Sequence, residues 1–361
     1  MKTTMIINIV KIFVALFTAF VFGVAITPLV TNFLYKHQLW KKRVRNEALG
    51  GGETPIFNRL HKDREVGTPR MGGIIIWVSV LLTIVTFWFL AQIFPHITTN
   101  KLNFLSQNQT WLPLFTLVAA SLVGLADDIL QVYNRGGYIA GGLSLSKRVF
   151  IVLLLGLIGA WWFYFKLDTS VITVPFYGNF DLGFLFIPFF MIVTLATFSG
   201  GVIDGIDGLS GGVMASIFAA YAGIAFSQNQ IDLATFCAAI VGGILAFLWF
   251  NIPPARFYMS ETGMLGLTVA LSVVAFLSNA VLVLPIIAFP LLAASASDII
   301  QFASKRLRNG KKVFLVAPIH HHFEALGWPP YKVTMRFWIL SVVFAVVGMT
   351  ISIVGSLVGV L

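Results

Sequence analysis

Charged residues are scarce in this chain of 361 residues, because Asp, Glu, Lys and Arg together make up 11% of it, against 58% hydrophobic residues. A soluble globular protein needs a largely polar and charged surface, so this composition excludes that class. Apolar runs of about 20 residues, the length that spans a bilayer, recur along the whole sequence. With a mean hydropathy of +0.90, the chain is expected to be an all-α polytopic membrane protein.

Cysteine is nearly missing as well. The single one, Cys237, lies in an apolar stretch, which excludes an intramolecular disulfide and a thiolate metal centre and leaves a packing role. A signal peptide is not expected either. The first apolar run, 6–33, is too long for one and lacks a small-residue cleavage site followed by a soluble domain.

The apolar runs predict about ten transmembrane helices in one integral membrane domain, 1–361, with both chain ends outside the cytoplasm. A short strand is predicted on the outer side at 171–176. The predicted spans are 6–33, 71–94, 111–126, 148–166, 182–199, 211–227, 232–251, 262–277, 279–303 and 335–360.

Basic residues are concentrated in alternate loops, at 36–70, 135–148, Arg256 and 305–336. This alternation follows the positive-inside rule and places these loops in the cytoplasm. The net charge of +10 is therefore explained by topology in a lipid bilayer, and no nucleic-acid partner is expected.

Acidic residues fall where apolar segments end on the same predicted side: Asp127 and Asp128 together, then Asp204, Asp207 and Glu261. Adjacent carboxylates at a membrane edge are costly unless a cation binds them. A divalent metal with a phosphate-bearing substrate fits this pattern. The plainer alternative is a set of solvated loop acids, and Glu261 alone could be an ordinary helix-start acid.

Two further segments carry polar groups suited to a nucleotide substrate. Asp204 and Asp207 stand three residues apart among glycines, which would put both on one face if the segment is helical. The segment lacks the ligand number of an EF-hand. His320, His321 and His322 cannot all face one metal on a regular helix, and imidazoles that donate to a diphosphate fit better.

Taken together, these motifs resemble those of the phospho-N-acetylmuramoyl-pentapeptide transferases, a branch of the polyprenyl-phosphate N-acetylhexosamine-1-phosphate transferases. The resemblance implies a ten-helix fold in the bacterial inner (plasma) membrane, with an active site that faces the cytoplasm. It implies Mg²⁺ as cofactor, undecaprenyl phosphate and UDP-N-acetylmuramoyl-pentapeptide as substrates, UMP as a product, and a homodimer. The segments that carry it are Gly67–Gly73, Asp127–Asp128, Gly142–Lys147, Asp204–Leu209, Pro318–Glu324 and Gly327–Pro329.

Carried over position by position, the resemblance implies three roles for residues of this chain. The catalytic group is Asp127, Asp128 and Glu261, with Asp127 as base or orienter at the lipid phosphate. The metal ligands are Glu261, Asp128 and Asp204. The substrate-binding residues are Asn251, Tyr258, Asp204, Asp207, His320, His321, His322 and Lys147.

The chain departs from the family pattern at several of these motifs. Glu261 stands where the family has Asp, and Phe198 and Gly201 stand where it has Asn. Arg70 replaces a Thr and Gln131 replaces a Lys. Three alternatives therefore stay open: a related N-acetylglucosamine-1-phosphate transferase, a non-catalytic membrane descendant, and a transporter, which would instead carry its polar residues at the midplane.

Overall fold

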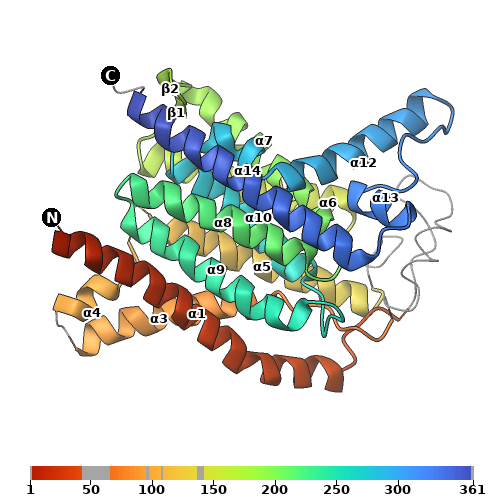
Figure 1. Cartoon of the computed structure of the whole chain (residues 1–361), viewed down its shortest axis with the longest axis horizontal. Helices are drawn as coiled ribbons and strands as arrows, with labels where there is room; N and C mark the ends of the chain where they lie inside the picture. Colours follow the sequence, from red (N-terminus) through yellow and green to blue (C-terminus); the bar gives the residue numbers. More distant parts are fainter. Residues whose placement is uncertain (1, 43–65, 95–96, 107–108, 136–141, 359–361) are drawn as a thin grey trace.

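The computed structural model describes residues 2–42, 66–94, 97–106, 109–135 and 142–358. Within these ranges nine helices are long and apolar enough to cross a bilayer, and a bent pair makes a tenth candidate. The prediction of a multi-pass all-α membrane protein is confirmed (Figure 1). The nine are α1 (Lys2–Lys36), α3 (Ile74–Ile93), α5 (Trp111–Val132), α6 (Leu145–Trp161) with η1 (Trp162–Lys166), α7 (Phe186–Ser199) between η2 (Gly183–Leu185) and η3 (Gly200–Ile203), α8 (Leu209–Ser227), α9 (Ile231–Asn251), α10 (Ser260–Leu277) and α14 (Pro330–Val358).

The bent pair falls in the predicted span 279–303, and the prediction of one continuous helix there is wrong. The short elements η4 (Val281–Val283) and α11 (Leu284–Ile287) meet α12 (Phe289–Leu307) at an angle of 79°. Pro290 lies in the first turn of α12, where its missing N–H costs nothing. The same residue cannot continue a helix that arrives from α11. As a result α12 points away from the bundle (Figure 1).

Two central helices are enclosed by the others. In their most apolar windows α10 is 89% buried and α9 is 83% buried, whereas α1 is 22% and α14 is 28% buried. Glycines mark the closest helix crossings. A side chain at Gly242 of α9 would meet the backbone of Leu16, and one at Gly124 of α5 would meet the backbone of Glu261. Close approach through small residues is how membrane helices associate without a hydrophobic driving force.

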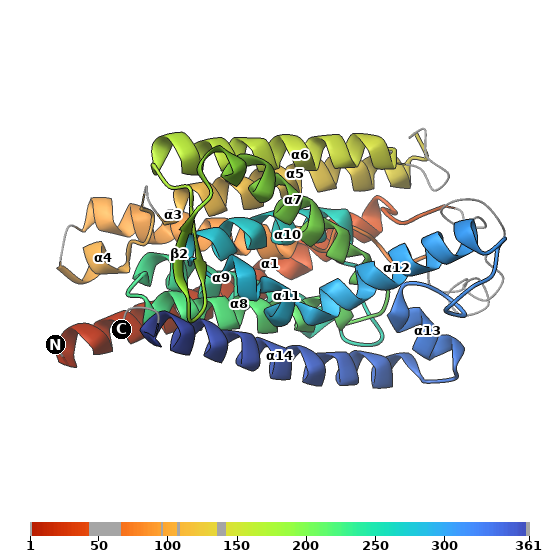
Figure 2. The ribbon, with the colours of Figure 1, turned by 90° about the horizontal axis from the view of Figure 1, so that it is seen from above.

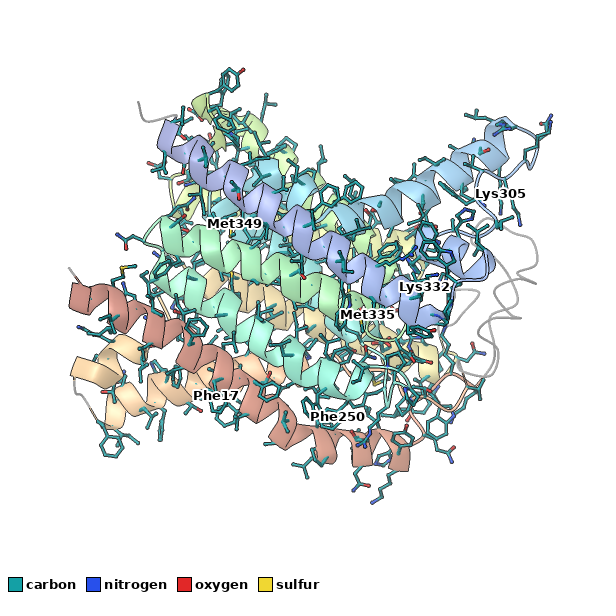
Figure 3. The ribbon with its side chains drawn as sticks, in the orientation of Figure 1. Phe17, Phe250, Lys305, Lys332, Met335 and Met349 are labelled. Atoms are coloured by element: carbon teal, nitrogen blue, oxygen red, sulfur yellow. The ribbon has the colours of Figure 1, made fainter. Side chains whose placement is uncertain are left out.

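The two ends of the bundle differ in character. The chain termini and the hairpin of β1 (Val171–Val174) and β2 (Gly178–Asp181) lie at one end, with α4 (Ile97–Leu102) nearby (Figure 2). The strand predicted at 171–176 is thus confirmed over 171–174. The opposite end carries α13 (Ile319–Ala325) and the basic residues Lys305 and Lys332 (Figure 3).

Candidate active site

Two loops are joined by backbone hydrogen bonds at the end that carries α13. Tyr258 N–H donates to Pro69 O at 2.9 Å, and Gly72 N–H donates to Tyr258 O at 2.8 Å. Gly73 continues the pairing and has no room for a side chain, because the backbone of Gly263 lies against it. The glycines at 72 and 73 therefore bring the segment before α3 onto the start of α10, and Arg70 with it.

The aspartate pair lies inside α5, within two turns of its last residue, Val132. The prediction that the helix ends before the pair, at 126, is wrong. Asp128 is fully buried, and its Oδ2 accepts hydrogen bonds from Thr262 N at 2.9 Å and Thr262 Oγ1 at 2.7 Å. Its Oδ1 accepts one from Arg70 Nε at 3.2 Å. These donors offset the cost of burying the carboxylate.

Arg70 is a permanent cation at this place. Burial acts to lower its pKa, but the carboxylates of Asp128 and Glu261 prevail and raise it above the usual value. The residue that departs from the family pattern therefore supplies the positive charge beside Asp128.

Asp127 has a different set of partners. Its Oδ1 accepts a hydrogen bond from Leu143 N at 2.5 Å, and its Oδ2 accepts one from Gln131 Nε2 at 2.9 Å. Gly142, with φ of +87°, places Leu143 N, and any side chain at Gly142 would collide with Asp127 and Gln131. Arg148 completes the set, with a terminal nitrogen 2.8 Å from Asp127 Oδ2.

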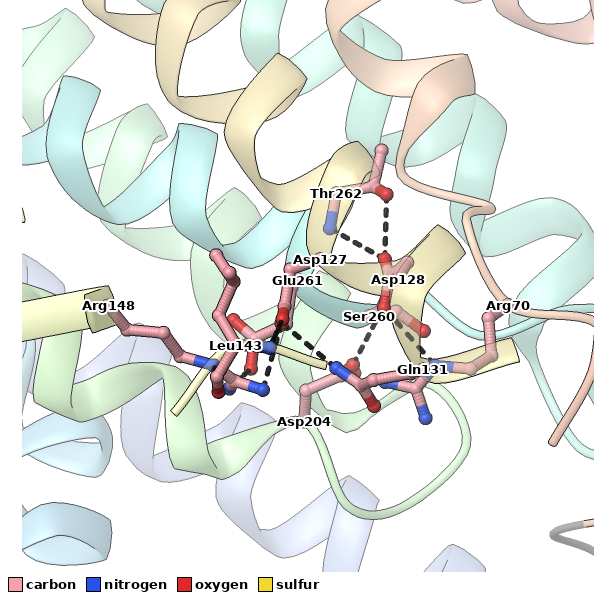
Figure 4. Close-up of polar contacts among 10 residues, drawn as sticks. All are labelled: Arg70, Asp127, Asp128, Gln131, Leu143, Arg148, Asp204, Ser260, Glu261 and Thr262. Carbon is pink, nitrogen blue, oxygen red and sulfur yellow. Dashed lines mark hydrogen bonds and ion pairs between the residues drawn. The ribbon is translucent and has the colours of Figure 1, made fainter. Parts of the chain in front are cut away.

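Glu261 lies in the first turn of α10, as predicted, and shares Arg148 with Asp127. The second terminal nitrogen of Arg148 lies 2.5 Å from Glu261 Oε1. One guanidinium thus bridges a carboxylate of α5 and a carboxylate of α10 (Figure 4). Lys147, one of the predicted substrate-binding residues, is exposed and lines a pocket of about 310 Å³ together with Phe150.

Asp204 reaches the same cluster from the turn before α8. Its two oxygens accept hydrogen bonds from Ser210 Oγ at 2.7 Å and Ser260 N at 2.8 Å. Burial raises the pKa of the Asp204 carboxyl above its usual value, against the opposing effect of these hydrogen bonds. Asp207 points elsewhere, to Ala255 N at 3.2 Å. The condition that 204–207 is helical is not met, because η3 ends at Ile203.

Asn251 and Tyr258, expected near the nucleotide, are both used within the protein. The buried amide of Asn251 accepts a hydrogen bond from Gly208 N at 2.9 Å and donates one to Phe257 O at 2.8 Å. It therefore fixes the turn after Asp207 to the loop between α9 and α10. Tyr258 is half-buried, and its backbone forms the loop pairing with Pro69.

The three histidines lie on α13 and do not act alike. The Nε2 atoms of His320 and His321 lie so close to Gly205 that a side chain there would collide with both rings. His321 Nδ1 lies 2.7 Å from Glu324 Oε2. His322 points to the preceding loop instead, where its Nδ1 accepts a hydrogen bond from Leu315 N at 3.2 Å. The structure therefore brings two of the three imidazoles to the turn that carries Asp204.

The donor types at this end suit a hard divalent cation, which prefers carboxylate oxygens. Among the described residues, however, no group of three His, Cys, Asp or Glu side chains is arranged closely enough to hold a metal ion. Asp127 and Glu261 are instead joined through Arg148. The residues fit Mg²⁺ by chemistry, and their arrangement requires side-chain adjustment to bind it.

Sequence reasoning missed four contributors to the cluster. Arg148 directly follows Lys147, the last residue of the Gly142–Lys147 motif on which the resemblance was based. Thr262 and Ser260 flank Glu261, so the first turn of α10 supplies donors on both sides of its acid. Arg70 was seen only as a departure. Two cations that accompany four acids at one end of the bundle are the signal that could have identified them.

Comparison with known proteins gives one consistent result. The glycosyl transferase family 4 profile matches residues 110–279. Phospho-N-acetylmuramoyl-pentapeptide-transferase of Dichelobacter nodosus is 35% identical over 308 residues, 80% of each chain. The protein of that name from Geobacillus thermodenitrificans is 32% identical over 349 residues, 95% of this chain and 98% of the relative. The one from Levilactobacillus brevis is 35% identical over 289 residues, 79% and 84% of the two chains.

Proposed function

The chain belongs to the family of phospho-N-acetylmuramoyl-pentapeptide transferases, and we propose that it performs their reaction at the cluster of Asp127, Asp128, Asp204 and Glu261. Phospho-N-acetylmuramoyl-pentapeptide passes from UDP-N-acetylmuramoyl-pentapeptide to undecaprenyl phosphate. A bond forms between an oxygen of the lipid phosphate and the sugar-bearing phosphorus, the bond from that phosphorus to UMP breaks, and lipid I and UMP result.

The observation that carries the proposal is the gathering of four acids and two arginines from five segments of the chain at one end of the bundle. Phosphoryl transfer demands mainly positioning and charge stabilisation, because charge spreads over the phosphoryl oxygens in the transition state. A cluster of opposed charges fixed by Thr262 and Leu143 supplies both.

Within this cluster Asp127 orients the lipid phosphate or accepts its proton. Its carboxylate lies beside Leu143 and Arg148, at the start of α6, where exposed Phe150 faces outward. An acceptor lipid with its chain in the bilayer therefore meets Asp127 at the edge of the bundle.

Asp128, Asp204 and Glu261 would hold Mg²⁺, which when bound neutralises the charge of the diphosphate. His320 and His321, beside Gly205, are placed to donate to the phosphate or sugar of the nucleotide. Asn251 contributes by holding the two loops that border this space. Asp207 and Tyr258 stand next to Gly208 and Phe257, which Asn251 joins, and this supports placing the uridine beside them.

The site opens to the cytoplasm in a bacterial inner membrane. This orientation is supported by the basic residues at the same end of the bundle, including Lys305 and Lys332, because such residues are retained on the cytoplasmic side. The nucleotide arrives from water and the acceptor lipid from the inner leaflet, and both reach a site at this edge.

The test is Mg²⁺-dependent release of UMP by the purified protein, given undecaprenyl phosphate and UDP-N-acetylmuramoyl-pentapeptide. Glu261→Gln should reduce the rate by about 100-fold or more, because it removes the charge at the diphosphate. Glu261→Asp keeps the charge and should lose less. UDP-N-acetylglucosamine is the second donor. Turnover with that donor alone would assign the related sugar-phosphate transferase, and no turnover with either by folded protein would refute the transferase function.

A further inference from the structure

Arg148 occupies a central position among the acids. Its terminal nitrogens lie 2.8 Å from Asp127 and 2.5 Å from Glu261, and its Nε donates to Leu143 O at 3.2 Å. The Arg148 side chain is only 18% exposed, and the Asp127 side chain is 3% exposed. The guanidinium is therefore a fixed bridge between two helices rather than a solvated surface charge.

The Arg148 bridge reduces the repulsion among the neighbouring carboxylates of the cluster. Asp127 and Asp128 are both buried, and Glu261 contacts the same guanidinium as Asp127, so several carboxylates lie close together. Like charges so close repel each other. A planar guanidinium has two parallel edges of N–H donors, so it can bind two carboxylates at once. The protein itself thereby offsets part of the negative charge of the acid cluster.

A divalent cation held by Glu261 requires the carboxylate that Arg148 occupies. Metal ligands must present free lone pairs, and a metal ion placed beside a fixed guanidinium meets strong repulsion in a site of low dielectric constant. We infer that Arg148 and the divalent cation are alternative partners of Glu261, so that Arg148 leaves this carboxylate, and with it Asp127, when the metal binds. This inference rests on the proposed function for the presence of a divalent cation at the cluster.

Arg70 is not the exchanging residue. It contacts Asp128 through Nε alone, and the other oxygen of Asp128 is held twice by Thr262. Arg148 extends from the first turns of α6 across to α10, where it contacts Oε1 of Glu261. Once withdrawn, the guanidinium remains near the cluster as a donor for an anionic diphosphate.

The experiment measures Mn²⁺ binding to substrate-free protein in detergent, with free Mn²⁺ followed by electron paramagnetic resonance. Arg148→Gln should bind Mn²⁺ at least about tenfold more tightly than the unaltered protein, since a charge-assisted contact no longer competes. Arg148→Lys keeps one charge without the two-edged geometry and should fall between the two. Arg135→Gln removes the same charge from the exposed segment after α5 and is the matched control, with an affinity within about twofold of the unaltered protein.

A second readout separates exchange from a purely structural role. Without metal, Arg148→Gln should have a lower melting temperature, because two carboxylates lose their cation. Mn²⁺ should then raise that temperature more in Arg148→Gln than in the unaltered protein, as linkage requires of a tighter ligand.

Equal or weaker Mn²⁺ binding by Arg148→Gln would overturn the inference, and so would an absence of Mn²⁺ binding in all variants. If Arg148→Gln does not fold, Arg148→Lys takes its place in the test. An affinity of Arg148→Lys for Mn²⁺ no higher than that of the unaltered protein would then overturn the inference. These outcomes are independent of UMP release. If the protein releases UMP but Arg148→Gln binds Mn²⁺ no more tightly, only the exchange of Arg148 for the metal is refuted. If the protein releases no UMP but Arg148→Gln binds Mn²⁺ more tightly, only the transferase function is refuted.

Discussion

Asp128 and Thr262 form a double hydrogen bond across the boundary between α5 and α10: one carboxylate oxygen accepts both the backbone N–H and the hydroxyl of the threonine. Both side chains are fully buried. The contact fixes the side chain of Asp128 relative to the first turn of α10, and therefore relative to Glu261. The following predictions begin with this contact.

Replacement of Thr262 by Val should destabilise the protein by about 1–3 kcal/mol, because Asp128 loses one of its donors without replacement by water. Thr268→Val is the matched control. Thr268 is equally buried on α10, but its hydroxyl donates to the helix carbonyls of Met264 and Leu265, which keep their backbone partners. Unfolding midpoints in detergent measure both, and equal losses in the two variants would argue against a special role for the Asp128 contact.

The pair of Arg70 and Asp128 should behave as a coupled unit. Arg70→Gln leaves a buried carboxylate without its cation, and Asp128→Asn leaves the cation without its carboxylate, so each single change costs about 3–5 kcal/mol. The double variant should be more stable than the sum of the two losses predicts, with a coupling energy above about 1 kcal/mol. Thermal or chemical unfolding of the four proteins gives this number.

The control for that cycle is the ion pair of Lys11 and Asp232, which lies 2.6 Å apart elsewhere in the bundle. Lys11→Gln combined with Arg70→Gln should give additive losses, because the two sites share no partner. The coupling energy of Arg70 with Asp128 should exceed that of Lys11 with Arg70. If it does not, Arg70 does not stabilise Asp128.

Asn251→Asp should lower stability more than Asn251→Ala at neutral pH. The new carboxylate can still accept from Gly208 N–H, but it faces the carbonyl oxygen of Phe257, to which Asn251 now donates. Repulsion between the two oxygens adds to the lost hydrogen bond. Hydrogen exchange of the amides at 205–208 and 255–258 should rise in both variants. Unchanged exchange there would mean that the amide does not hold these loops.

Much of the fold follows from the sequence, because a membrane demands long apolar helices and these are visible as runs. The break at 279–303 was missed, since Pro285 and Pro290 sit in a run that stays apolar throughout. The end of α5 was placed too early for the opposite reason. Asp127 and Asp128 end the apolar run, but the helix continues to Val132 because its polar side chains are paired inside the protein.

The site could be anticipated in kind but not in its contacts. The acids were found because charge is rare, and rarity makes each position informative. Arg148 was not identified, because the positive-inside rule already explains a basic residue at the start of a helix on the side predicted to be cytoplasmic. Only the packing of α6 beside α5, and of α5 on α10, distinguishes Arg148 from exposed Lys147.

The contact between α5 and α10 extends along both helices. A side chain at Gly124 would meet the backbone of Glu261, and one at Gly266 would meet Leu117 and Ser121. Helices absorb changes in bilayer thickness by tilting. Two helices that pack along their length tilt together, so the spacing of the acids that they carry is insulated from the lipid composition of the membrane around them.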